Sequence, residues 1–198
     1  MYKLDTKAAL AAEGNRITDI GKYVGKFTTA EAVIASKGTH GVKLSFATDS
    51  GQTTGLNLWT MGADGTQYGG YKVLMSIMCC LGVRELSTVD RRVKDKDGTE
   101  RLASFLPELE NKPIGLLLET EDWESGEKSG TQMVLKLPFQ VDTELVASEI
   151  LGRKTSPEQL PKIIATLKHH TLKTARKPAA QQSNAASSFD AGDDDIPF

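Results

Sequence analysis

The last six residues of the chain carry groups that suit the recognition of another protein: Asp193, Asp194, Asp195, Ile196, Pro197 and Phe198. The terminal phenylalanine offers a ring for a pocket, and its α-carboxylate can accept charge-assisted hydrogen bonds from an arginine or a lysine. The isoleucine and the proline add apolar contact, and the proline restricts the backbone, which lowers the cost of ordering the peptide. The aspartates would speed the encounter with a basic surface. This composition predicts a docking peptide for a partner protein.

Aromatic and basic side chains earlier in the chain could bind an unpaired nucleic-acid strand, because such binding needs ring faces for bases and cations for phosphates. Trp59 alternates with Leu58 and therefore points away from the core. Base stacking would explain this outward orientation, and packing under a loop or in an oligomer interface would explain it equally well. Tyr68 and Tyr71 could stack on bases, although Tyr71 fits slightly better as the first buried residue of a helix. The predicted cationic contacts are Lys22, Lys26, Lys43, Arg91 and Arg92, with Lys37 in a turn between them.

The sequence contains no pattern typical of a catalytic or metal-binding site. His40, His169 and His170 have no cysteine or carboxylate at metal-ligand spacing, and the adjacent pair is more typical of surface charge. We therefore expect no enzymatic activity, no metal and no cofactor. Cys79 and Cys80 are neighbours, so a disulfide between them would be strained, and we expect two reduced thiols in a cytoplasmic protein. No stretch approaches the roughly 20 apolar residues that span a bilayer.

Charge is segregated near the C-terminus. Residues 153–177 contain seven basic residues and one acidic residue, whereas residues 178–198 contain four aspartates and no basic residue. A basic block followed by an acidic end indicates nucleic-acid contact plus an acidic interaction tail. Charge alone would favour a simpler reading, in which a solvated basic helix face precedes an unimportant tail.

The elements that must position these groups follow from the hydrophobic pattern. Strands are predicted over 21–36, 42–47, 56–59, 114–118 and 133–141, and a helix over 71–81. Residues 84–101 are highly charged and are predicted to form a solvated loop, followed by a short helical turn over 102–106. Three strands, a helix and two further strands follow the order of the OB-fold, a five-stranded antiparallel barrel that commonly binds single-stranded nucleic acid.

The predicted organisation has four parts. An N-terminal arm occupies residues 1–20, and the mainly β, OB-fold-like domain occupies residues 21–152. A basic segment over 153–177 includes a predicted helix that starts near 155–158. Residues 178–198 are rich in Ala, Gln, Ser and Asn and cannot bury enough apolar surface to order themselves, so they are predicted to form a disordered linker that ends in the acidic tip.

In its last six residues the chain is similar to the bacterial single-stranded DNA-binding proteins. In that family the C-terminal tip binds replication, recombination and repair proteins, so the resemblance implies partners of these classes. Phe189 and Asp190 extend the similarity upstream. Ala191 and Gly192 interrupt it where the family usually continues with acidic or apolar residues.

The body more closely resembles the single-stranded DNA-binding proteins of phages and mobile elements, in residues 21–23, the strand over 43–46 and the helix over 74–82. This resemblance implies binding to single-stranded DNA without strong sequence preference, in a host cytoplasm where the tip would recruit host enzymes. A homo-oligomer is compatible with the sequence. The alternative is an adaptor or decoy whose body binds a protein instead of DNA and whose tip imitates the family's tail. A recombination enzyme or annealing factor is less consistent with the sequence.

Deleting Phe198, or adding residues after it, should abolish recruitment of partner proteins while sparing DNA binding, because both the ring and the free carboxylate are lost or displaced. A pull-down with the full chain and each variant measures recruitment, and an oligonucleotide titration is the control. A pull-down that survives the deletion contradicts this role for the tip.

Overall fold

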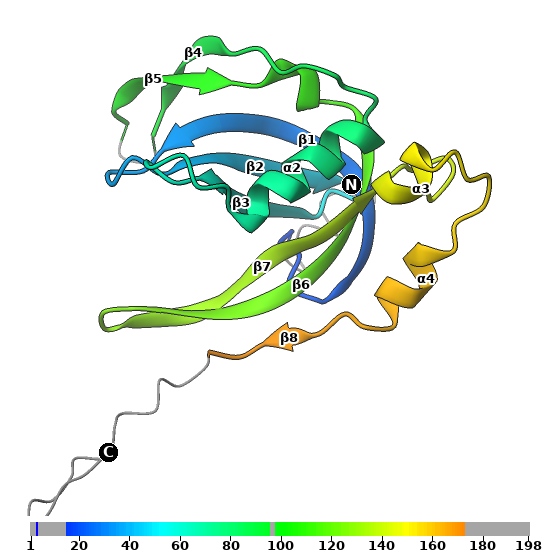
Figure 1. The fold of residues 1–198 in the computed structure, drawn as a ribbon. Coiled ribbons are helices and arrows are strands. Elements are labelled where there is room, and N and C mark those ends of the chain that lie inside the picture. The colour runs from blue at the N-terminus through cyan, green and yellow to red at the C-terminus, as the bar shows by residue number, and fades with distance from the viewer. Residues whose placement is uncertain (1–2, 4–14, 96–97, 173–198) are drawn as a thin grey trace, which may run out of the picture.

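The computed structural model describes residues 3, 15–95 and 98–172, which form a mainly β body with an antiparallel sheet (Figure 1). The strands are β1 (Gly21–Ile34), β2 (His40–Thr48), β3 (Thr53–Met61), β4 (Val89–Lys94), β5 (Glu100–Phe105), β6 (Pro113–Ser125), β7 (Lys128–Phe139) and β8 (His169–His170). The helices are α2 (Gly69–Cys80), the short 3-10 turn η1 (Pro107–Leu109), α3 (Ala147–Leu151) and α4 (Gln159–Ile164).

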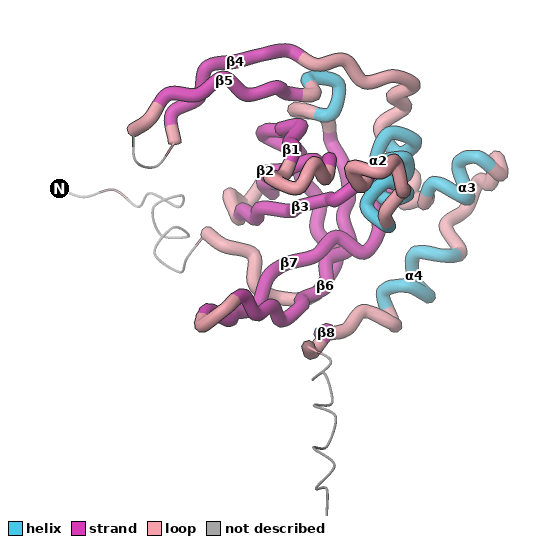
Figure 2. Tube along the Cα trace, turned by 60° about the vertical axis from the view of Figure 1, so that its left-hand side comes forward, coloured by secondary structure: helices cyan, strands magenta, loops and turns pink. Residues whose placement is uncertain are grey.

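Strand β1 joins the whole sheet because it is long enough to have three partners. One edge pairs with β2 from Gly25 to Ile34, and the other pairs first with β6, over residues 21–26, and then with β5 at two positions. The register shifts between Phe27 and Thr29, which bends the strand as bulges do. In Figure 2 the β4–β5 hairpin therefore lies on one side of β1–β3 and the β6–β7 hairpin on the other.

The main core lies between the inner face of β1–β3, helix α2 and the β6–β7 hairpin. Phe27 and Phe46 meet edge to face with ring centroids 5.9 Å apart, and both are fully buried. Leu74 and Ile77 of α2 pack into the same cluster, which explains why the helix covers β3 and β7. A second cluster, centred on Phe139, is formed by Leu117, Val146 and Leu160.

The mainly β, antiparallel character is confirmed, and so are the first three strands and the helix that becomes α2. The five-stranded arrangement is wrong, because the sheet has eight strands. The loop predicted over 84–101 and the helical turn over 102–106 contain β4 and β5 instead. Charged side chains of this hairpin form ion pairs with neighbouring strands; Arg101 of β5, for example, binds Glu31 of β1 at 2.6 Å. These ion pairs explain how so highly charged a segment can form strands.

The helix predicted in the basic segment is present as the short α4, but the structure also has η1, α3 and the short β8, which the pattern does not predict, so the helix placement differs from the prediction. In the basic segment Leu160 is buried, Ile163 and Leu167 pack against the second cluster, and Ile164 is exposed. Most of the predicted N-terminal arm, and residues 173–198 with the acidic tip, lie outside the described residues.

The two thiols are free, with Cys79 half-buried and Cys80 buried on α2. Burial, with the neighbouring Cys79, raises the pKa of Cys80 to about 12, so this thiol stays protonated. Among the described residues, no helix is both long enough and apolar enough to cross a membrane.

A buried carboxylate ties α3 to α4. Glu149 is 1% exposed, and its two oxygens accept backbone N–H hydrogen bonds from Val146 at 3.1 Å, Glu158 at 2.7 Å and Gln159 at 2.9 Å. Burial by itself raises the pKa of Glu149, but these three donors outweigh it and hold the pKa below its ordinary value. The carboxylate therefore stays charged and substitutes for missing helix caps.

Glu149→Gln should lower the free energy of unfolding by about 2 kcal/mol at pH 7, because the amide group meets backbone donors that need an acceptor. Because the folded-state pKa is depressed, this contribution is present above the ordinary carboxyl pKa and is lost as the pH falls through the depressed value. Urea unfolding at pH 7 and pH 3 measures the difference, with the exposed Glu124→Gln as control. Equal stabilities of Glu149→Gln and the wild-type chain at pH 7 would show that the hydrogen bonds to the Glu149 carboxylate do not stabilise the fold.

Candidate nucleic-acid interface

Trp59, one of the predicted DNA contacts, lies exposed on the outer face of β1–β3. On β3, Leu56 and Leu58 point into the core, whereas Trp59 is 41% exposed on the opposite face. The strand register places Trp59 opposite Gly41 of β2, and Gly41 opposite Val33 of β1. The outward orientation predicted from the alternation is therefore present, and the ring lies across the neighbouring strand.

Gly41 makes the position of this ring possible. A Cβ atom added at Gly41 would lie 2.7 Å from ring atom Cε3 of Trp59 and 2.8 Å from the backbone oxygen of Leu58. Both separations are shorter than van der Waals contact, so any larger residue would push the indole off the strand or move the backbone. The indole thus lies against β2, which limits its rotation without burying it.

Trp59 and Tyr68 line a shallow groove of about 360 Å³ beside the β1–β2 turn. The remaining lining comes from this turn, which contributes Ala35, Ser36, Lys37 and Thr39. Tyr68 is 43% exposed, and Lys37 has no ion-pair partner within the described ranges. Two exposed rings beside a free ammonium group are the combination that stacks a base and contacts its phosphate.

The β3–α2 loop is built to hold Tyr68 in place. The carboxylate of Asp64 accepts hydrogen bonds from the backbone N–H of Thr66 at 3.0 Å and from its hydroxyl at 2.9 Å, and these bonds lower the pKa of Asp64. The Tyr68 N–H donates to the Thr60 carbonyl at 2.9 Å. A Cβ at Gly62 would lie 2.8 Å from the Tyr68 hydroxyl, so glycine leaves the room that this ring occupies.

Helix α2 starts directly against Trp59. A Cβ at Gly70 would lie 2.4 Å from the Trp59 carbonyl oxygen, so only glycine lets the helix begin this close to β3. Tyr71 follows in the first turn and is half-buried; the first buried residue of α2 is Leu74, not Tyr71. Tyr71 does not line the groove that contains Trp59 and Tyr68.

The predicted lysines fall at different places around the body. Lys43 is exposed on the same outer face as Trp59, where the register sets it between Asn57 and Glu31. Lys26 is exposed on the same face, further along β1. Lys22, in contrast, binds the Glu144 carboxylate, and its ammonium group lies 5.2 Å from the Phe139 ring centroid. Lys22 is therefore engaged away from the groove.

The neighbouring arginines of β4 point to opposite faces of the strand. Arg91 donates to both carboxylate oxygens of Glu110, at 2.8 and 3.1 Å, and lies over the Phe105 ring at 4.9 Å from its centroid. It therefore joins the hairpin to the body. Arg92 is exposed and stands opposite Leu102 of β5. The two residues do not form one cationic site.

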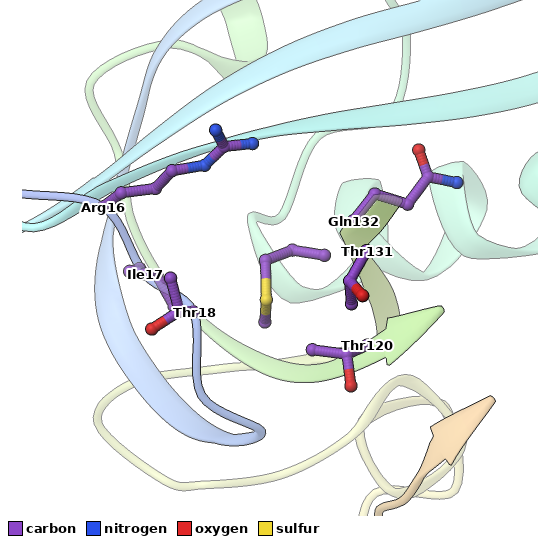
Figure 3. Close-up of a pocket in the computed structure, with 7 residues that line it drawn as sticks. Arg16, Ile17, Thr18, Thr120, Thr131 and Gln132 are labelled. Carbon is purple, nitrogen blue, oxygen red and sulfur yellow. The ribbon is translucent and has the colours of Figure 1, made fainter. Parts of the chain in front are cut away.

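A second hollow, of about 210 Å³, lies where the N-terminal segment crosses the β6–β7 hairpin (Figure 3). Ile17, which is 1% exposed, seals one wall, and Thr120 and Met133 form another. The charged group that borders it is Arg16, which in Figure 3 lies across the hollow from Thr120. Within the described part of the chain, no group of three or more His, Cys, Asp or Glu residues could hold a metal ion.

The comparisons with known proteins return no relative: no family model matches the chain, and no curated protein matches it.

The sequence pattern singled out Trp59, Tyr68 and Lys37, which line the groove, but not the glycines that shape it. Gly41, Gly62 and Gly70 are each in close contact with Trp59 or Tyr68. Their positions in the chain, on both sides of the two aromatic residues, are the only signal that the sequence offers. Which atoms they approach depends on the strand register.

Gly41→Ala should displace the Trp59 indole, because the added methyl group occupies the space of the ring edge. In a Trp123→Phe background, which leaves Trp59 as the only tryptophan, we expect a red-shifted emission and faster quenching by acrylamide. Gly55→Ala is the matched control, because a Cβ at Gly55 on the same strand meets no atom within 4 Å. Identical spectra for the two alanine variants would contradict the close contact.

Proposed function

We propose that this protein binds single-stranded DNA without strong sequence preference during replication, recombination or repair, and that its C-terminal tip recruits partner enzymes. The observation that carries the first part is the groove of Trp59, Tyr68 and Lys37. Its two rings lie close against neighbouring glycines and are still exposed. Stacking on such rings is tolerant of sequence, because every base has a π-face.

The cations on the outer face support the same use. Lys37, Lys43 and Lys26 are exposed, and among the described residues none of them has an ion-pair partner. Each phosphate that they neutralise would release counterions, so affinity should fall as salt rises. Glu31 lies on the same face but is engaged by Arg101.

We also propose that β1, β2, β3, β6 and β7 form an open, OB-like barrel with β4 and β5 as an inserted hairpin. This proposal is supported by the antiparallel pairing of β1 with both β2 and β6, by the β6–β7 hairpin and by the position of α2 against β3 and β7. β3 and β7 approach each other, but the described residues contain no β3–β7 ladder, so the barrel would be open there.

The recruiting role of the tip rests on its sequence and on its similarity to the tails of bacterial single-stranded DNA-binding proteins. A reducing, cytoplasmic setting is proposed on the two free thiols. The alternative function, an adaptor whose body does not bind DNA, predicts the same behaviour of the tip and differs only in the body.

Titration of a labelled oligo-dT strand with the full chain at low salt separates these functions. We expect binding that weakens steeply with salt, and a loss of about tenfold in affinity for Trp59→Ala, since stacking on one ring contributes about 1–3 kcal/mol per base. Trp123→Ala, in the acidic β6–β7 hairpin, is the matched control and should bind as the wild-type chain does.

Lys43→Ala should reduce the slope of log affinity against log salt by about 0.7, the value for one phosphate contact on a single strand. A full chain that ignores the oligonucleotide at low salt would favour the adaptor. Equal affinities for Trp59→Ala and Trp123→Ala would place DNA binding elsewhere on the body.

A further inference from the structure

The β4–β5 hairpin separates from β1 soon after the two join. The ladder between β1 and β5 has only two residue pairs, and it ends at Ala32 and Ser104. β1 nevertheless continues to Ile34, and on the other side β5 extends back to Glu100. The two strands therefore diverge and leave an opening. We call this opening the β1–β5 gap; its walls are residues 33–34 and residues 100–103.

The strand register shows which backbone groups border the gap. Along an antiparallel strand, the N–H and C=O groups of alternate residues point to opposite edges. The Ala30 carbonyl accepts the N–H of Leu106 at 2.8 Å on the β5 side, so the groups of Ala32 and Ile34 point to that side as well. By the same alternation, the groups of Leu102 point from β5 toward β1. Within the described chain, neither Ile34 nor Leu102 has a ladder partner across the gap.

The side chains beside these backbone groups are apolar and exposed. Ile34 is 67% exposed and Leu102 is 65% exposed. Both line one hollow of about 530 Å³, into which Lys43 also projects from β2. Exposed apolar residues are common when they are scattered singly, but two that line the same hollow are a mark of a binding surface. Here they stand next to backbone donors and acceptors, so a flat ligand with a polar edge can both pack and form hydrogen bonds.

The charges of the hollow leave one cation available. Arg101 binds Glu31 at 2.6 Å and Asp95 at 3.1 Å, so these three groups are engaged with one another and together carry one negative charge. Lys43 balances that charge, and among the described residues it has no ion-pair partner. A phosphate in this hollow would therefore lie at Lys43 and not at Arg101.

The hollow adjoins the groove that contains Trp59. Its wall residue Ile34 is followed directly by residues 35–37, which line that groove. Across the sheet, Trp59 on β3 and the wall residue Val33 on β1 stand in one row, two strands apart. Two strand spacings amount to about 10 Å. A base on Trp59 would thus leave a neighbouring part of the same DNA strand beside the gap.

We propose that the β1–β5 gap is a second nucleotide subsite for the DNA strand that stacks on Trp59; this proposal rests on the DNA-binding function proposed above. The base inserts between the side chains of Ile34 and Leu102, and its edge meets their N–H and C=O groups. The adjoining phosphate contacts Lys43. Each wall offers both a donor and an acceptor, and every base edge carries groups that can pair with them, so the subsite does not select one base.

An extended peptide is the other ligand that strand edges recognise. Strand addition uses a row of unpaired backbone groups. On β1 the gap offers the groups of Ile34 alone, which is too short a row for a ladder. A nucleobase needs only one or two such bonds, and Lys43 suits a phosphate. The gap therefore fits a nucleotide better than a peptide.

Amide hydrogen exchange of the full chain, measured by NMR with and without oligo-dT at low salt, tests the subsite. We expect bound oligonucleotide to slow exchange of the Ile34 and Leu102 N–H groups by about fivefold, the factor for one net hydrogen bond. The N–H of Leu151, on α3 and outside the hollow, is the internal control and should exchange at the same rate in both samples.

Ile34→Ala and Leu102→Ala shorten exposed side chains, so neither variant endangers folding. Each should weaken oligo-dT binding about fourfold, the loss for about one buried methylene group. The slope of log affinity against log salt should stay unchanged, because no charge is removed. Leu151→Ala is the matched control, since Leu151 is 77% exposed, and it should bind as the wild-type chain does.

Unchanged exchange of both N–H groups in the complex with oligo-dT would overturn the subsite and leave the gap to a peptide. Affinities of Ile34→Ala and Leu102→Ala equal to that of Leu151→Ala would overturn it as well. In both cases Trp59→Ala would still weaken binding if the body binds DNA. A full chain that binds no oligonucleotide refutes the proposed function and the subsite together, so the two failures are distinguishable.

Discussion

The structure depends on one strand that serves three partners. β1 pairs with β6 over its first residues, with β2 over most of its length and with β5 near its end. It can do this because Gly25 removes a side chain where the strand passes the Ala47 carbonyl, at which a Cβ would stand only 2.1 Å away. The bulge after Phe27 then redirects the strand. Both hairpins and the groove take their positions from this bend.

Close approach is also the principle behind the groove. Here a glycine on the next strand lets the indole of Trp59 approach that strand closely, and another glycine leaves room for Tyr68. The rings are held and still exposed. Such a surface loses little conformational freedom when a flat ligand stacks on it, which is the advantage of preorganisation.

Buried or half-buried carboxylates join the peripheral elements to this body. Glu110 binds Arg91 of β4, Glu119 binds the β8 segment, and Glu149 joins α3 to α4. In each case the carboxylate accepts several donors, as a charged group removed from water must. Charged residues that look like solvated surface in the sequence therefore act as connectors.

The sequence by itself determined the alternation of β2 and β3, the α2 stripe and the outward position of Trp59, because periods of two and of 3.6 are local properties of the chain. It also determined the composition of the acidic tip, because composition does not depend on any tertiary contact. It could not predict β4, β5 or β8, because their charges find partners far away in the chain, such as Glu31 for Arg101 and Glu119 for His170. Only the tertiary structure decided that Arg91 and Arg92 are separated, that Lys22 is engaged and that Gly41 lies under Trp59, because each of these depends on strand register and not on sequence spacing.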